Sequence, residues 1–218
     1  IINRVKKEGL VFKDAQLSSD GKKIMSFVDK SHVMFWDAMN GNLLSELKSK
    51  DRFSYFRTYL SPDGEKVATV STDTVTVVDA NSGNILMQCT GQLPLPFAFS
   101  RDGKKILTVS KKNEIGLWDI FSGNLLTTIP AQDKKIRTAQ FSPDGDKVLT
   151  VTLSDKVRLW NILNGDLIAD LTDSLGWEVN AQFTKDGNKI IIAPRGWKVR
   201  IWDIVSGKLI SGLKKESS

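Results

Sequence analysis

The chain has 218 residues, of which 31 are basic and 25 acidic, giving a net charge of +6, and it contains one cysteine. A chain of this length buries roughly 70% of the surface that its unfolded form exposes, so we expect a stable core without crosslinks or a metal. One cysteine excludes an internal disulfide, and the longest aliphatic run, Ile190 to Ala193, is far shorter than the roughly 20 residues of a membrane-spanning helix. The start shows no signal-peptide pattern, so we expect a cytoplasmic protein without membrane insertion.

A sequence of about 42 residues recurs five times along the chain. Asp-Gly pairs begin at Asp20, Asp63, Asp102, Asp144 and Asp186, with spacings of 43, 39, 42 and 42 residues. Trp-Asp-like pairs begin at Trp36, Val78, Trp118, Trp160 and Trp202, with spacings of 42, 40, 42 and 42 residues. A repeat too small to bury its own apolar face must stack on its neighbours. We assign one domain, 1–218, with repeats 11–51, 52–92, 93–133, 134–175 and 176–218.

Each repeat begins with two short strands around the Asp-Gly pair. Apolar and polar residues alternate in runs bounded by Gly, Asp, Asn and Ser, which is typical of half-buried strands and not of helices. Strand a precedes the pair, as Ala139 and Phe141 do, and strand b follows it, as the run KVLTV does at 147–151. Pro62 and Pro143 pre-set the first turn dihedral, and the glycine can take the positive φ that a tight hairpin requires.

Two further strands complete each repeat. Strand c places apolar residues such as Val157 and Leu159 on one face and its tryptophan on the other, and strand d follows a turn glycine. Four antiparallel strands form one small twisted sheet, and such sheets stacked radially form a propeller. We therefore predict an all-β propeller of five four-stranded blades.

The recurring elements, of which SPDGxK, TVSxD, VxLWD and SGxLL are the clearest forms, recur with variation in all five repeats across nearly the whole chain and resemble the WD40 family. This resemblance implies a β-propeller in which the d-to-a and b-to-c connections gather on one face of a disc and engage partners. The chain departs from the family in two ways. The Gly-His pair that often precedes strand a has only Gly91-Gln92 as its nearest relic, and Val78 replaces one tryptophan. We therefore expect the family's buried polar network to be absent and the packing between blades to be mostly apolar.

The N-terminal segment reads as a sixth copy of strand d. Ile1 to Val5 repeats the apolar and polar order of Leu43 to Leu47, and Ile1 precedes Asp20 by 19 residues, as Leu125 precedes Asp144. Residues 1–10 are therefore either strand d of a preceding, truncated blade in a larger propeller or a strand that closes or lies on another surface. We favour the first interpretation. The start at Ile1 instead of methionine predicts a processed chain, a trimmed chain or a piece of a larger polypeptide.

Residues for chemistry are few. With one histidine, His32, and one cysteine, zinc sites built from His and Cys are excluded, and the place of His32 in strand c predicts a packing role. Cys89 lies in a hydrophobic strand d, which predicts a buried, inert thiol. The aspartates of the Asp-Gly pairs recur once per repeat and are interpreted as turn formers. We expect no enzyme activity, no metal and no cofactor.

Candidate partner-binding residues lie in the connections. Trp177 and Trp197 are not among the repeated tryptophans; alignment places Trp177 in the d-to-a connection of the fifth repeat and Trp197 in its b-to-c turn, beside Arg195 and Lys198. Tryptophan and arginine are typical interface anchors. The alternative is that the two indoles cover the end of the last blade. The other candidates are Phe53 and Arg57 in the second repeat and Lys134 and Arg137 in the fourth.

Three functions remain open. The leading hypothesis is a non-catalytic interaction module or scaffold that presents loops on one face to a protein or peptide. The second is recognition of a polyanion, such as a phosphoinositide head group or nucleic acid, through Lys134, Arg137, Arg195 and Lys198. The basic surplus is spread along the chain, which disfavours nucleic acid. The third and weakest is a propeller enzyme. The identity of the partner and the oligomeric state stay open.

Overall fold

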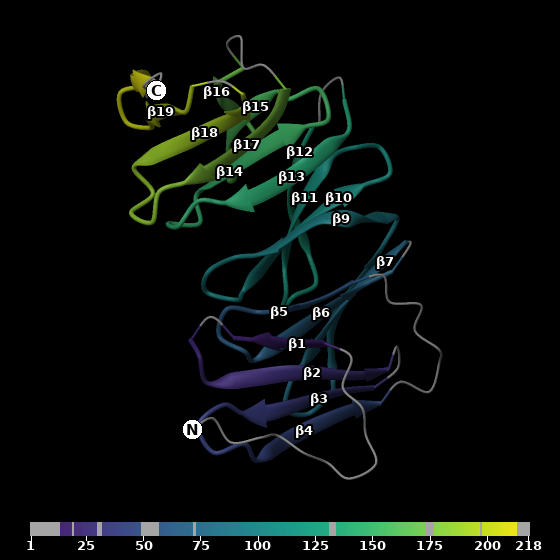
Figure 1. The fold of residues 1–218 in the computed structure, drawn as a ribbon. Helices are drawn as coiled ribbons and strands as arrows, with labels where there is room; N and C mark the ends of the chain where they lie inside the picture. The colour runs from purple at the N-terminus through teal and green to yellow at the C-terminus, as the bar shows by residue number, and fades with distance from the viewer. Residues whose placement is uncertain are drawn as a thin grey trace. The chain divides into compact units, whose positions relative to one another are not determined.

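A computed structural model of the chain describes residues 14–18, 20–29, 32–48, 57–71, 73–130, 134–172, 177–196 and 198–212. In these residues every regular element is a β-strand (Figure 1). The strands form five four-stranded sheets, in each of which the strands lie in sequence order with antiparallel neighbours. The all-β prediction of five four-stranded blades is therefore confirmed.

The twenty strands follow the predicted a, b, c, d order. The first sheet contains β1 (Asp14–Leu17), β2 (Lys23–Asp29), β3 (His32–Asp37) and β4 (Leu43–Lys48), and the second contains β5 (Arg57–Leu60), β6 (Lys66–Val70), β7 (Thr74–Asp79) and β8 (Ile85–Thr90). The third contains β9 (Gln92–Phe99), β10 (Lys105–Ser110), β11 (Ile115–Asp119) and β12 (Leu125–Ile129). The fourth contains β13 (Ile136–Phe141), β14 (Lys147–Thr152), β15 (Val157–Asn161) and β16 (Leu167–Asp170), and the fifth β17 (Trp177–Phe183), β18 (Lys189–Arg195), β19 (Arg200–Asp203) and β20 (Lys208–Gly212).

The chain divides into two compact units. Unit 1 holds the first and second sheets with the turns Asp102–Lys105 and Asp119–Asn124. Unit 2 holds Leu95–Arg101, Ile106–Trp118, β12 and the fourth and fifth sheets, so it contains most of the third sheet.

The Asp-Gly pairs form the a-to-b turns, as predicted. In the first of them the Ser18 hydroxyl donates to Asp20 Oδ1 at 2.6 Å, and the Lys22 N–H donates to the same oxygen at 3.0 Å. The hydrogen bond from Ser18 is the main cause that lowers the pKa of Asp20. Gly21 has a φ of 72°, which glycine adopts without strain. The interpretation of these aspartates as turn formers is confirmed.

The core of each unit lies between neighbouring sheets. In unit 2 the buried cluster joins strand-c residues Val157 and Leu159 of the fourth sheet to Val179, Ile190 and Ile192 of the fifth. A smaller cluster in unit 1 joins the first two sheets. Neighbouring sheets thus bury each other's apolar faces within each unit, which is why one repeat cannot form a stable structure alone.

Side-chain hydrogen bonds accompany this apolar packing. The Gln16 amide in β1 donates to the Thr58 carbonyl of β5 at 3.2 Å, and the Gln140 amide in β13 donates to the Ala181 carbonyl of β17 at 2.7 Å. In each case strand a of one sheet bonds to the backbone of strand a of the next. These contacts fix the register between neighbouring sheets in a way that apolar contact does not.

The strand-c tryptophans of three sheets make one polar contact each, although the histidine of the family's buried network has no counterpart before strand a. In the first, third and fourth sheets the strand-c tryptophan donates from Nε1 to a strand-b hydroxyl, as Trp36–Ser26 at 2.7 Å, Trp118–Thr108 at 2.8 Å and Trp160–Thr150 at 2.9 Å. This tryptophan–hydroxyl pair forms without a histidine because the accepting hydroxyl lies on strand b of the tryptophan's own sheet. In the fifth sheet Ile192 occupies the acceptor position, and Trp202 Nε1 is buried with no hydrogen-bond partner among the described residues.

The histidine and the cysteine take structural places. His32 begins β3 and is buried, with Nε2 2.7 Å from Glu46 Oε1 of β4, so it joins two strands of one sheet. Cys89 is buried in β8, and burial raises its pKa to about 11, so the thiol is protonated and unreactive at neutral pH. The strand predicted in residues 1–10 lies outside the described residues.

Candidate partner-binding site

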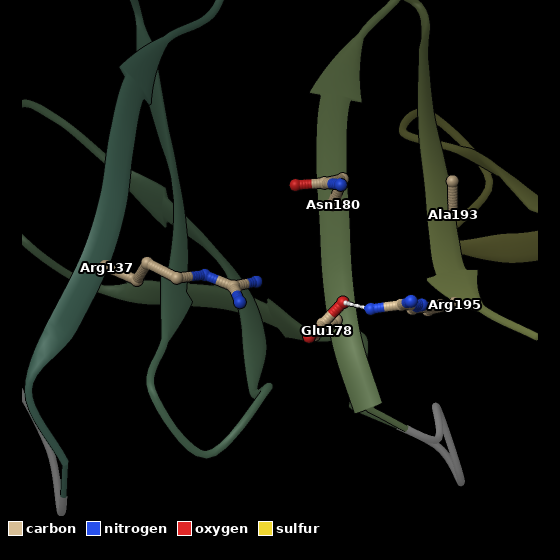
Figure 2. A pocket seen from close by; sticks show the side chains of 5 residues that line it. All are labelled: Arg137, Glu178, Asn180, Ala193 and Arg195. Carbon is tan, nitrogen blue, oxygen red and sulfur yellow. Dashed lines mark hydrogen bonds and ion pairs between the residues drawn. The ribbon is translucent and has the colours of Figure 1, made fainter.

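A hollow of about 440 Å³ lies in unit 2 at one end of strands β13, β17 and β18. Its walls are Arg137, Glu178, Asn180, Ala193 and Arg195 (Figure 2). Strands β13 and β17 are strand a of the fourth and fifth sheets, and β18 is strand b of the fifth. The hollow therefore opens at the end of these strands where the d-to-a and b-to-c connections lie, which is the end predicted to engage partners.

Arg137 forms one wall and also joins two sheets. From β13 its guanidinium donates to the Val179 carbonyl of β17, and Nη2 lies 3.4 Å from Asp155 Oδ1. The side chain is 30% exposed. These two partners hold the guanidinium in one orientation, so it is pre-organised on the edge of the hollow.

Asp155, in the b-to-c turn of the fourth sheet, holds the beginning of β17. Oδ1 accepts the Val179 N–H at 2.9 Å and Oδ2 accepts the Glu178 N–H at 3.1 Å. The residue has a φ of 60°, a conformation that aspartate tolerates better than most residues. Its carboxylate is thus occupied by two backbone donors and Arg137.

Asn113 has the same role in the preceding repeat. In the b-to-c turn of the third sheet, with a φ of 66°, it accepts the Ile136 N–H at 2.9 Å and donates to the Lys134 carbonyl at 2.8 Å. The role of these two turn residues was not predicted, although Asn113 and Asp155 stand 42 residues apart, one repeat length. That spacing was the signal that could have revealed it.

Glu178 and Arg195 form an exposed ion pair inside the hollow. Arg195 Nη1 lies 2.8 Å from Glu178 Oε2, and the side chains are 64% and 55% exposed. Glu178 has a φ of 50°, and the pairing of β17 with β18 shifts register between Trp177 and Asn180. An exposed pair of this kind contributes roughly 0–1 kcal/mol, so a partner can replace either member at little cost.

The hollow lies at a basic end of unit 2. Exposed lysines lie there in the b-to-c turn of the third sheet, just before β13 and between β18 and β19, namely Lys111, Lys112, Lys134, Lys135 and Lys198. The hydrogen bonds from Asn113 to Lys134 and from Leu153 to Lys135 join these segments. Among the described residues the acidic groups at this end are Glu114, Asp155, Asp170 and Glu178, and the last three pair with arginines, so the exposed lysines give the described part of this end a positive charge.

The structure brings together some members of the predicted set. Arg137 and Arg195 line the hollow, and Lys134 and Lys198 are exposed at the same end of unit 2. The placement of Trp177 in the d-to-a connection is wrong, because Trp177 is the first residue of β17 and pairs with Arg195 in register. Strand β17 begins earlier than the alternation of apolar and polar residues predicts. Arg57 begins β5 in unit 1 and is exposed. Phe53 and Trp197 lie outside the described residues.

Two residues that line the hollow, Glu178 and Asn180, were not predicted from the sequence. Both follow Trp177 at the register shift of β17, and a register shift of this kind leaves no mark in the apolar pattern. Among the residues that the structure describes, no group of three or more His, Cys, Asp or Glu residues could hold a metal ion. No helix in the same described ranges is long and apolar enough to cross a membrane.

Five four-stranded antiparallel sheets with one internal order and exposed connections are the blade architecture of a β-propeller. The family model of the WD domain, G-beta repeat (WD40), matches residues 123–161, from the turn before β12 to the end of β15. Over 130 residues the chain is 25% identical to the COMPASS component SWD3 of Saccharomyces cerevisiae, covering 59% of this chain and 41% of that protein. The chain thus spans less than half the length of this relative. The resemblance to the WD40 family is confirmed.

Proposed function

We propose that the chain is a non-catalytic WD40 interaction module that binds a protein or peptide through the basic end of unit 2. The observation that carries this proposal is the hollow, in which Arg137 and Arg195 lie at the end where the b-to-c connections gather. Arginine is enriched among the residues that contribute most to binding at interfaces. The name of the yeast relative makes it a component of a larger assembly, which supports a scaffold role.

The residues of the hollow support binding over catalysis. Two guanidinium groups, one amide and one methyl group surround a single carboxylate, and Arg195 pairs with that carboxylate at 2.8 Å. Acid–base or nucleophilic catalysis needs a reactive group beside a proton acceptor or an orienting partner. The hollow offers charge recognition instead. A cytoplasmic location stays a prediction.

Selection from a displayed library of random 12-residue peptides tests this function directly. Peptides that bind the whole chain should lose binding when Arg195→Glu and Lys198→Glu are combined. The matched control combines Lys189→Glu and Lys208→Glu, two exposed lysines at the opposite end of the same sheet. Peptides that lose binding to the control variant equally, or to neither variant, would contradict the proposal.

The second candidate function is recognition of a polyanion by the same basic end. The observation that favours it is the group of exposed lysines around the hollow, Lys134 and Lys135 among them. Binding to phosphoinositide vesicles or to single-stranded RNA should then fall steeply with salt, because neutralising phosphates releases counterions. A peptide affinity that exceeds both and changes little with salt would assign the site to protein recognition.

A further inference from the structure

We propose that the hollow recognises an anionic side chain of the partner, a carboxylate or a phosphate, and that Glu178 is an internal stand-in which this side chain displaces. The inference rests on the proposed function and names the chemical group that the site reads. Figure 2 shows the basis for it: the Glu178 carboxylate already occupies the guanidinium of Arg195 within the hollow.

The ion pair between Arg195 and Glu178 is easily replaced by a competing anion. Arg195 and Glu178 are both more than half exposed, so water surrounds the pair and weakens it. A carboxylate or phosphate brought by a partner meets the same guanidinium in a hollow from which the partner excludes water. Such a charge-assisted contact is stronger than the exposed one that it replaces.

Arg137 supplies a second hydrogen-bond donor, and its orientation is fixed before a ligand binds. The Arg137 guanidinium is fixed by the Val179 carbonyl and by Asp155, and it points from β13 toward β17 (Figure 2). The Asn180 amide projects from β17 on the side that faces β13 (Figure 2). An anionic group in the hollow therefore meets one guanidinium that needs little ordering, that of Arg137, beside the more mobile Arg195 guanidinium and the Asn180 amide.

Glu178 has a strained backbone conformation. A φ of 50° is unfavourable for glutamate, and Asp155 holds it by accepting the N–H groups of Glu178 and Val179. Strained residues persist only where their surroundings fix them, and they gather at binding sites. Here the fixed backbone sets the Glu178 carboxylate against Arg195, in the place of a ligand.

The exposed lysines near the hollow are positively charged. Lys134, Lys135 and Lys198 are exposed at this end, and the Asp155 carboxylate is already occupied. A cationic side chain would meet like charges on approach, whereas an anionic one would be attracted. The electrostatics therefore select the ligand class that the two arginines select.

The test uses three fluorescein-labelled 12-residue peptides of one Gly-Ser sequence that carry four glutamates, four phosphoserines or four glutamines. Fluorescence anisotropy with the whole chain should show binding of the glutamate or the phosphoserine probe and none of the glutamine probe. The glutamate probe alone would assign a carboxylate, and the phosphoserine probe alone a phosphate. Equal binding of the glutamine probe would overturn the proposal.

Two variants separate the stand-in from general charge effects. Glu178→Gln should tighten the anionic probe about fivefold, because an exposed competing pair is removed, and Arg195→Gln should weaken it about tenfold or more. The matched control is Glu114→Gln, which removes one negative charge at the same end without touching Arg195. Equal tightening by Glu178→Gln and Glu114→Gln, at unchanged melting temperatures, would overturn the role of Glu178.

The outcome also separates this inference from the proposed function. If library peptides depend on Arg195 and Lys198 but Glu178→Gln leaves their affinity unchanged or weaker, the module binds partners and the stand-in is wrong. If no library peptide depends on this end, the proposed function itself fails.

Discussion

The fourth and fifth sheets share one plan, and the candidate site lies where the fifth departs from it. At positions 42 residues apart, buried Ile136 is replaced by exposed Glu178, Leu153 by Arg195 and Val151 by the smaller Ala193. The changes at Ile136 and Val151 exchange buried apolar packing for charge and space, and the change at the exposed Leu153 adds a charge. A repeat whose neighbours already supply the core can give up local apolar contacts at one end, and that end becomes available for binding.

The same two sheets differ in how they satisfy their tryptophans. Trp160 is 3% exposed and donates to Thr150, whereas the buried Trp202 Nε1 has Ile192 where its acceptor would be. The fourth sheet is thus better satisfied internally than the fifth. Substitutions in the two sheets test this difference, from the largest expected effect to the smallest.

Replacing Asp155 should have the largest effect. Asp155→Ala removes the acceptor of two backbone N–H groups, one on the fully buried Val179, and one partner of Arg137. Leaving such donors unpaired costs roughly 2–3 kcal/mol of unfolding free energy, measured by urea denaturation. Asp155→Asn keeps one acceptor and tolerates a positive φ, so it should cost less. Equal stability of Asp155→Ala and the parent chain would contradict the role of this turn.

Removing the indole N–H should separate the two tryptophans. Trp160→Phe leaves the buried Thr150 hydroxyl without its donor, whereas Trp202→Phe removes an unsatisfied donor. The first should therefore destabilise the chain by about 1–2 kcal/mol more than the second, as measured by thermal or urea unfolding. A smaller loss for Trp160→Phe than for Trp202→Phe would show that the hydrogen bond does not stabilise the sheet.

Giving the fifth sheet the missing acceptor should sharpen the comparison. Ile192→Thr places a hydroxyl where the fourth sheet has Thr150, at the cost of apolar contacts in the cluster around Leu159 and Val179. Its cost should be about 1 kcal/mol smaller with Trp202 present than in the Trp202→Phe background. Unfolding of the four chains of this cycle gives the coupling, and a coupling near zero would contradict the assigned acceptor position.

The Asp-Gly turns should give the smallest, pH-dependent effect. Burial raises the pKa of Asp144, but hydrogen bonds from Ser142, Asp146 and Lys147 outweigh it, so the pKa lies below 3.8. Because the folded pKa is lowered, Asp144 adds stability above pH 3.8, and this stability is lost as the pH falls through the folded value.

Unfolding at neutral pH and at about pH 3 measures this contribution, and Asp144→Asn should reduce the difference between the two. Asp186 in the fifth sheet accepts from Thr184 and serves as the parallel position. An unchanged pH dependence in both asparagine variants would contradict the turn assignment.

The sequence predicts the sheets well because each repeat shows four runs of alternating apolar and polar residues separated by turn residues. The Asp-Gly turns, the four strands per repeat and the buried Cys89 all follow from these local patterns. The tryptophan–hydroxyl pairs were not predicted, because the acceptors Ser26 and Thr150 lie two residues past the strand-b positions opposite Trp36 and Trp160, and only the register identifies them.

The sequence predicted two of the five residues that line the candidate site. Arg195 was chosen because it stands beside the non-repeated Trp197, and Arg137 because its position in the fourth repeat is similar to that of the candidates in the second. Glu178 was not predicted, because its place depends on a positive φ, a shift of register and a hydrogen bond from a turn in another sheet. Such features arise from packing between sheets, which one repeat read alone does not contain.

Lysine labelling of the whole chain, with and without a peptide recovered from the library, tests the central claim most directly. Acetylation of Lys134, Lys135 and Lys198 should slow when the peptide binds at the basic end of unit 2, while Lys189 and Lys208 at the opposite end react as before. Protection of Lys189 and Lys208, with Lys134 and Lys198 unchanged, would contradict the account.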